Sequence, residues 1–377
     1  MISCLSCNGG TVTSGDDPSM RLLVATLNGV RVFDRRNEST PWKCRRQGLT
    51  DFHISAILYE PYSGLVFAGA HGKGGIWVSD DAGETWHPRG RPLKNAHIYT
   101  LAAQHRGANV VLYAGTEPAA LYRSDDLGRT WRELSGLREV PGTERWSFPP
   151  PPHIAHVKNV AFHPAEPTTL YVCIEQGAVL KSVDDGETWF ELDSYESGED
   201  FFERDNHRIL PKPSNPRELF MCGGEGLYYS PDGGDTWDHR TDREHRIGYP
   251  DAMFIDPRDD NALFMAGPAQ PPRDWGRTRR SDATVMHSPD GGRTWRELDK
   301  GLPKPVVGNI EAMGMHHFGG RVMLSAGTAT GEVFVSDDAG ENWTCIARGL
   351  PPISKGGHYR WFLPEDERTR VEQRMHA

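Results

Sequence analysis

Five histidines stand at or near the start of short apolar segments that recur along the chain: His53, His97, His156, His207 and His358. Neutral imidazoles are the commonest protein ligands of transition metals. Histidines at equivalent places of separate segments are not expected from packing alone. We therefore predict that they bind one divalent transition metal (iron, zinc or manganese). His53, His97 and His156 would lie on one side of the ion, and His207 or His358 opposite them.

A second repeated place, in the connection after the next strand of each segment, carries a histidine and three acidic residues: His71, Glu117, Glu175 and Glu225. A metal-ligating histidine usually donates its other ring N–H to a carboxylate. We expect these four residues to orient the metal ligands.

We aligned the segments on the proline that ends most of them. The residues two positions after the segment starts then form a further set: Ser55, Tyr99, Lys158, His207, Asp251, Glu311 and His358. Side chains two residues apart in a strand face the same way, so this set extends the same site. Tyr99, Lys158 and Tyr249 are candidate acid/base or orienting groups. Asp251 and Glu311, from adjacent segments, are the carboxylate pair that glycoside hydrolysis would use.

Two long connections carry aromatic and basic residues. Residues 135–155 contain Trp146, and residues 267–284 contain Trp275 and Arg277. Long loops on a rigid scaffold are where binding residues concentrate. We expect Trp146, Trp275 and Arg277 to bind a small organic substrate that is anionic or aromatic.

The segments belong to a repeat whose clearest mark is an eight-residue turn. It occurs six times: SDDAGETW (79–86), SDDLGRTW (124–131), SVDDGETW (182–189), SPDGGDTW (230–237), SPDGGRTW (288–295) and SDDAGENW (336–343). The turns join short apolar stretches bounded by Gly, Pro and Asp, a pattern typical of strands. Four strands per repeat, at a repeat length typical of propellers, predict propeller blades.

The pattern S-x-D-x-G-x-T/N-W resembles the Asp-box (BNR) repeat of sialidase-type propellers. This resemblance covers most of the chain and implies that the turns are scaffold, on the face away from the site. It does not imply sialidase activity, because the chain has no Arg-Ile-Pro motif. The histidine ring resembles, in architecture only, propeller enzymes with an axial metal, such as carotenoid-cleaving oxygenases and some uronate lyases.

The expected fold is an all-β, seven-bladed propeller over residues 20–364. Residues 20–48 contain three strands without an inner strand, whereas 358–364 has the pattern of an inner strand without a blade. We therefore predict that these two chain ends pair in one blade and close the ring. Residues 1–19 are expected to be a flexible leader, and 365–377 a charged tail.

Charge and composition exclude some partners. The net charge of −10 argues against nucleic acid and against an anionic membrane surface as partners. No stretch has the roughly 20 apolar residues that span a bilayer. The N-terminus lacks a secretory signal and the cysteines stand mostly singly, so a cytoplasmic location is expected.

Three functions remain open. The first is a metal-dependent oxygenase, lyase or hydrolase with a small-molecule substrate. The second is a non-enzymatic docking or assembly-factor platform. The third is a metal-free glycoside hydrolase that uses Asp251 and Glu311.

Overall fold

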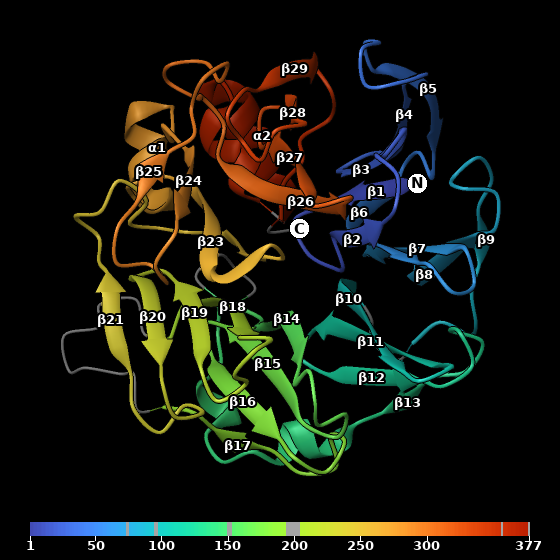
Figure 1. The fold of residues 1–377 in the computed structure, drawn as a ribbon, viewed down its shortest axis with the longest axis vertical. Coiled ribbons are helices and arrows are strands. Elements are labelled where there is room, and N and C mark those ends of the chain that lie inside the picture. Colours follow the sequence, from blue (N-terminus) through green and yellow to red (C-terminus); the bar gives the residue numbers. More distant parts are fainter. Residues whose placement is uncertain (73–74, 94–96, 149–152, 194–203, 356, 376–377) are drawn as a thin grey trace.

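Seven blades surround a central axis in the computed structural model, as predicted (Figure 1). The structure describes residues 1–72, 75–93, 97–148, 153–193, 204–355 and 357–375. Each blade is a sheet of four strands that follow one another from the axis to the rim, and one blade has a fifth strand.

Four blades lie in the first two thirds of the chain. Blade 1 contains β6 (His53–Glu60), β7 (Leu65–His71), β8 (Gly75–Ser79) and β9 (His87–Pro88). Blade 2 contains β10 (His97–Arg106), β11 (Asn109–Glu117), β12 (Leu121–Ser124) and β13 (Arg132–Glu133). Blade 3 contains β14 (His156–Phe162), β15 (Leu170–Glu175), β16 (Ala178–Ser182) and β17 (Phe190–Glu191). Blade 4 contains β18 (Asn206–Pro211), β19 (Leu219–Gly223), β20 (Gly226–Ser230) and β21 (Asp238–Thr241).

The remaining blades use both ends of the chain. Blade 5 contains β22 (Ala252–Asp256), β23 (Asp259–Gly267), β24 (Thr284–Ser288) and β25 (Arg296–Glu297). Blade 6 contains β26 (Ile310–Phe318), β27 (Arg321–Thr328), β28 (Val333–Ser336) and β29 (Thr344–Ala347), with β2 (Val12–Gly15) added to β26. Blade 7 contains β1 (Ile2–Leu5), β3 (Arg21–Thr26), β4 (Gly29–Asp34) and β5 (Lys43–Gly48).

Helices occur only between or after blades in the described residues. The 3-10 helices η1 (Ser135–Glu139) and η2 (Thr143–Arg145) precede blade 3, and α1 (Pro272–Thr278) lies in the β23–β24 connection. The chain ends in η3 (His358–Phe362) and α2 (Glu365–Met375). No described helix is long and apolar enough to cross a membrane.

The Asp-box turns fold as local hydrogen-bonded units. In the first turn, the amide of Gly83 donates to Ser79 Oγ at 2.7 Å, and Ser79 Oγ donates to Asp81 at 2.7 Å. The amide of Thr85 donates to the same carboxylate at 2.8 Å. Gly83 has a φ of +90°, which glycine adopts without strain. The turns are therefore scaffold built from short-range contacts.

The hydrophobic core consists of seven clusters, each between two neighbouring blades. Each cluster contains or contacts at least one tryptophan, and in six clusters one of these comes from an Asp box: Trp86, Trp131, Trp189, Trp237, Trp295 and Trp343. The seventh is Trp42 of blade 7, which has no Asp-box turn.

The prediction that residues 358–364 form the inner strand of blade 7 is wrong. That segment is the 3-10 helix η3, and the inner place is taken by β1, which pairs in parallel with β3. Residues 1–19 are therefore not a flexible leader: Cys4 and Leu5 of β1 are fully buried, and β2 pairs in parallel with β26. The N-terminal strands occupy this position because their apolar side chains become buried between blades 6, 7 and 1, next to β26 and β6 (Figure 1).

Candidate functional site

The channel mouth at which the inner strands begin is called the top mouth below. His53, His97 and His156 are the first residues of β6, β10 and β14. Each is paired across the sheet with the last residue of the neighbouring strand: His53 with His71, His97 with Glu117, and His156 with Glu175. The two repeated places that the sequence singled out are therefore cross-strand neighbours in consecutive blades.

The deeper set of residues lies at a repeated irregularity of the inner strands. The register of the first two strands shifts by one residue at Ser55, Tyr99, Lys158, His207 and Glu311. A β-bulge changes the direction of the side chain at the extra residue and is common next to functional sites. The sequence therefore predicted correctly that these residues lie at equivalent positions of the inner strands. Their side-chain directions are set by the bulge in each of these five blades, which the two-residue alternation does not predict.

Three imidazoles meet on the carboxylate of Glu117. His71 Nε2 is 3.2 Å and His97 Nδ1 is 3.7 Å from Glu117 Oε1. His156 Nδ1 is 3.3 Å from Glu117 Oε2. We call these four residues the outer cluster. The His97 side chain is 47% exposed and that of Glu117 18%, whereas His156 is buried. A ligand can therefore reach the outer cluster from solvent.

Local charges set the protonation of the outer cluster. Burial raises the pKa of Glu117, but hydrogen bonds from His156 and His71 outweigh burial and hold the pKa below its ordinary value. Burial and the neighbouring His71 lower the pKa of His97. Burial also lowers the pKa of His156, but its bonds to Glu117 and Glu175 reverse the sign, and the net pKa is raised. At neutral pH, Glu117 is ionised and His97 is uncharged.

The expected ligand triad does not converge. Among the described residues, His53, His97 and His156 do not form a group whose ligand atoms lie within 4.8 Å of one another, whereas His71, His97 and Glu117 do. The rings of His53 and His71 are neighbours, with centroids 5.3 Å apart. Burial, and to a smaller extent the charge of His71, lower the pKa of His53 to about 3. Two members of the converging group, His71 and Glu117, are therefore residues that the sequence predicted to orient the ligands.

A second, fully buried cluster lies deeper on the axis. Lys355 Nζ is 2.8 Å from Glu175 Oε1 and 2.6 Å from Asp251 Oδ1. Lys158 Nζ is 3.2 Å from Glu175 Oε2 and 3.6 Å from Asp251 Oδ1. We call these four residues the inner cluster. Two carboxylates and two ammonium groups alternate there, so the cluster is formally neutral.

Three of the four groups of the inner cluster are shifted towards their charged forms, whereas burial lowers the pKa of Lys158. Burial raises the pKa of Asp251, but Lys355 and Lys158 outweigh burial, and the net pKa is lowered. The same two lysines lower the pKa of Glu175 against burial. Burial lowers the pKa of Lys355, but Asp251 and Glu175 raise it well above its ordinary value. Sequence reasoning missed Lys355, because it lies after the last repeat and has no counterpart in another blade.

Blade 4 adds a third group of polar residues. His207 Nε2 is 3.1 Å from Asp205 Oδ1, and Tyr249 Oη donates to Asp205 Oδ2 at 2.9 Å. Glu175, Asp205 and His207 form the second described group whose ligand atoms lie within 4.8 Å of one another. All three residues are buried. Burial raises the pKa of Tyr249 well above its ordinary value, so it is a hydrogen-bond donor at neutral pH.

The C-terminal segment covers the site from the side of blade 6. Ser354 Oγ and the Lys355 amide donate to Glu311 Oε2 at 3.0 and 2.7 Å. His358 Nδ1 is 3.4 Å from Glu311 Oε1. His358 therefore reaches the top mouth from η3 rather than from a strand. Glu311 and Asp251 are both at most 3% exposed and are engaged by this segment.

The remaining predicted residues are dispersed. Tyr99 stacks on His156 with ring centroids 3.6 Å apart. Trp275 is buried against His358 and Phe362 and has no exposed face for a substrate. Arg277 is exposed and pairs with Asp274, and Glu225 pairs with Arg243 outside both clusters. Trp146 lines a cavity of the top face.

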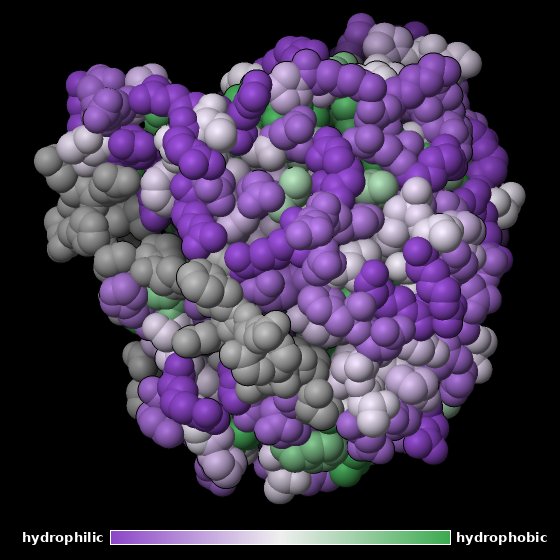
Figure 2. Space-filling model, turned by 90° about the vertical axis from the view of Figure 1, so that its left-hand side faces the viewer, coloured by the Kyte–Doolittle hydropathy of each residue, from purple (hydrophilic) through white to green (hydrophobic). Residues whose placement is uncertain are grey.

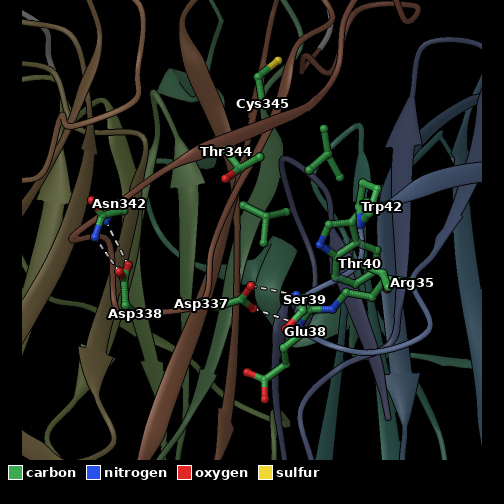
Figure 3. A pocket seen from close by; sticks show the side chains of 13 residues that line it. Arg35, Glu38, Ser39, Thr40, Trp42, Asp337, Asp338, Asn342, Thr344 and Cys345 are labelled. Atoms are coloured by element: carbon green, nitrogen blue, oxygen red, sulfur yellow. Dashed lines mark hydrogen bonds and ion pairs between the residues drawn. The ribbon is translucent and has the colours of Figure 1, made fainter.

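A cavity of about 580 Å³ between blades 6 and 7 is lined by groups that bind one another (Figure 3). Arg35 forms two hydrogen bonds to Asp337, at 2.7 and 2.8 Å, and lies over the ring of Trp42. Asn342 Nδ2 donates to Asp338 at 2.7 Å. The Arg35–Asp337 pair links blade 7 to blade 6, whereas the Asn342–Asp338 bond lies within the Asp-box turn of blade 6.

The comparisons with known proteins agree with this architecture. The BNR/Asp-box repeat model matches residues 77–88, which include the first Asp-box turn. In sequence, the chain is 24% identical over 208 residues to the oligoxyloglucan-reducing end-specific xyloglucanase of Emericella nidulans. That alignment covers 51% of this chain but 24% of the relative, so the chain spans about a quarter of that protein's length.

Two solved structures are similar over most of the chain. An ancestral GH74 enzyme has a TM-score of 0.56 at 15% identity, covering 80% of this chain and 39% of the enzyme. A structure of YCF48 bound to D1 peptide has a TM-score of 0.52 at 16% identity, covering 84% of this chain and 96% of YCF48. The Asp-box match and the fold together make this chain an Asp-box (BNR) repeat β-propeller.

Proposed function

We propose that this propeller is an enzyme that binds a divalent transition metal (zinc, iron or manganese) in the outer cluster. His71, His97 and Glu117 would be the ligands. The observation that carries the proposal is the convergence of their ligand atoms within 4.8 Å at an accessible place of the top mouth. Three protein ligands with a free position facing solvent are the usual composition of a catalytic zinc site.

The protonation of these residues supports metal binding. Metal ligands must be deprotonated carboxylates and neutral imidazoles. The lowered pKa of Glu117 and the lowered pKa of His97 both favour those forms. His156, 3.3 Å from Glu117 Oε2, would hold the carboxylate in place from the buried side. A metal there would supply Lewis-acid activation of a water molecule or of a substrate oxygen.

Hydrolysis is the reaction we favour, because the sequence relative named above is a xyloglucanase, which is a hydrolase. Tyr99, which stacks on His156 and whose ring centroid is 6.1 Å from that of His71, would be the acid/base or orienting group beside the proposed ion. The substrate would be a small organic molecule that enters from the top mouth. The inner cluster would serve as the rigid, charge-neutral floor beneath it.

The similarity to a xyloglucanase favours one second candidate, a metal-free glycoside hydrolase. Such an enzyme needs two carboxyl groups that reach the substrate, one of them a general acid with a raised pKa. Asp251 and Glu311 fit that role poorly, since both are buried and the pKa of Asp251 is lowered. In this candidate, Glu117 would be the carboxylate accessible to a sugar.

A docking platform is the third outcome that the experiment must separate. Figure 2 shows the side of the ring that carries β21 and α1 as mostly hydrophilic, with small separate apolar spots. The large hydrophobic residues that are exposed lie on separate elements of the described chain, among them Tyr62, Val183 and Val307. Large continuous apolar patches are the usual mark of a docking surface.

Elemental analysis of protein purified without a histidine tag tests the proposal. We expect stoichiometric transition metal in the native protein and its loss in His97→Ala. His105→Ala is the matched control, because His105 also pairs with a glutamate (Glu60, at 2.9 Å) but lies outside the top-mouth clusters. Native metal content in His97→Ala would contradict the proposed ligands.

The same proteins separate the alternatives. Hydrolysis of xyloglucan oligosaccharides that survives chelation and His97→Ala but is lost in Glu117→Gln would establish the metal-free hydrolase instead. Protein that folds, holds no metal and cleaves no such substrate would leave the docking platform.

A further inference from the structure

A cavity of about 400 Å³ opens on the top face between blades 2 and 3. It is lined by Pro118, Ala119, Arg138, Thr143, Trp146, His153, Ile154 and Ala155. Two of these residues are chain neighbours of the outer cluster: Pro118 follows Glu117, and Ala155 precedes His156. The cavity therefore lies beside the strand ends that carry Glu117 and His156 of the outer cluster. Its volume lies in the range of pockets that bind small organic ligands.

One wall of the cavity is aromatic and rigid. Trp146 packs against the cluster of blades 2 and 3, and a Cβ added to Gly177 would lie 3.1 Å from its ring. Glycine at position 177 thus allows the indole to approach the β15–β16 connection closely. Trp146 is partly exposed towards the cavity, and the other apolar lining comes from Pro118, Ile154 and Ala155. An aromatic face of this kind stacks on a planar or chair-shaped ring.

The opposite side of the cavity is polar and basic. The Arg138 side chain is 58% exposed and makes one ion pair, to Glu133 at 2.5 Å. A guanidinium has five N–H donors, so Arg138 keeps donors for a second carboxylate. His153 Nδ1 is 2.9 Å from the carbonyl oxygen of Phe148, which leaves Nε2 for a ligand. Thr143 adds a hydroxyl group.

We infer that this cavity is the substrate subsite of the enzyme and that it binds a cyclic organic acid. The ring would lie on Trp146, and the carboxylate would bind Arg138. This inference rests on the proposed function for its use in catalysis, but the cavity and its binding chemistry do not require a metal. Sugar acids and aromatic acids share the required chemistry, a six-membered ring that carries a carboxylate.

Isothermal titration calorimetry of the full-length protein with three probes tests the inference. Glucuronate represents sugar acids, benzoate represents aromatic acids, and glucose is the neutral ring. We expect one of the two acids to bind at least about tenfold more tightly than glucose, as a charge-assisted hydrogen bond gives. The acid that binds identifies the source of the ring. Equal binding of glucose and both acids, or no binding of either acid, would overturn the inference.

Variants locate the binding energy. Arg138→Ala should weaken binding of the preferred acid by about tenfold at an unchanged melting temperature. Trp146→Ala, measured at a temperature where the variant is folded, should also weaken acid binding, because the stacking surface for the ring is lost. Arg132→Ala is the matched control, because Arg132 forms a similar exposed ion pair, with Glu187 at 2.9 Å, away from the cavity. Unchanged affinity in Arg138→Ala would refute the carboxylate contact.

Titrations with and without a chelator keep the two proposals apart. Acid binding that persists in chelated protein supports the subsite even when elemental analysis finds no metal. A protein that contains metal but binds neither acid would refute the subsite alone.

Discussion

At the scale of single residues, Lys355 joins parts of the molecule that are far apart in sequence. Its ammonium group contacts Glu175, 180 positions earlier, and Asp251, 104 positions earlier. All three side chains are 1% exposed. If Glu175 and Asp251 lose this cationic partner, they keep the free-energy cost of being buried without the attraction that offsets it. The stability of the inner cluster therefore depends on Lys355.

Replacement of Lys355 by methionine should therefore destabilise the fold by about 3–5 kcal/mol, the range for breaking a buried ion pair. Chemical denaturation followed by circular dichroism measures the change. Lys304→Met is the control, since Lys304 is exposed and pairs with Asp299 on the surface. Equal stability of the Lys355 and Lys304 variants would show that the inner cluster does not need its second ammonium.

Acid should act on the same residues. The pKa values of Asp251 and Glu175 are lowered in the folded protein relative to 3.8 and 4.5, so their contribution to stability is present above pH 4.5. It is lost as the pH falls towards the folded-state values. In Lys355→Met the folded-state pKa values rise, so we expect the acid unfolding midpoint to move to higher pH. An unchanged midpoint would contradict the assigned cause.

At the scale of elements, the Asp-box turns are interchangeable supports. In the third turn, Asp184 accepts bonds from the Thr188 amide at 2.9 Å and from Ser182 Oγ at 2.8 Å. The Asp184 carboxylate is exposed, so water replaces part of what these bonds provide. The turn lies far along its strands from the top mouth, which begins at the other strand ends.

Asp184→Ala should lower the free energy of unfolding by about 1 kcal/mol, the net value of hydrogen bonds of this kind. Metal content and acid binding at the top mouth should stay unchanged below the melting transition. Val183→Ala changes the exposed variable position of the same turn and is the control. A loss of metal or ligand binding without a loss of stability would contradict the supporting role.

At the scale of the whole molecule, the N-terminal strands close the ring. β1 supplies the inner strand of blade 7, and β2 extends blade 6, so residues 2–15 bridge the two blades that the rest of the chain leaves adjacent. Arg35 and Asp337 join the same two blades further out. Closure removes the free sheet edges that an open propeller would expose.

Deletion of residues 1–8 should abolish cooperative unfolding, because it removes buried Cys4 and Leu5 and opens blade 7. Deletion of residues 364–377 should leave the transition cooperative, since α2 is outside every blade. Thermal melts of the two truncated proteins, followed by circular dichroism, decide between them. This order of effects is the reverse of what the sequence predicts, and the opposite result would restore closure by the C-terminal segment.

The sequence by itself determined the features that repeat. Six copies of one turn, spaced by short apolar strands, predict blades, because turn and strand formation depend on neighbours along the chain. Cross-strand pairs such as His97–Glu117 were also foreseeable, since a hairpin fixes which residues lie opposite each other.

Only the tertiary structure decided the features that occur once. The parallel pairing of β1 and the place of Lys355 between Glu175 and Asp251 join segments with no common repeat. The grouping of His71 with His97 joins two neighbouring blades, and pairing within one hairpin does not predict it. The β-bulges at Tyr99 and Lys158 are visible only in the strand register of the structure. The two-residue alternation of a regular strand does not predict them. Such contacts form where the closed ring buries apolar area and pairs buried charges. Both contributions to the free energy of folding arise only when all seven blades are assembled.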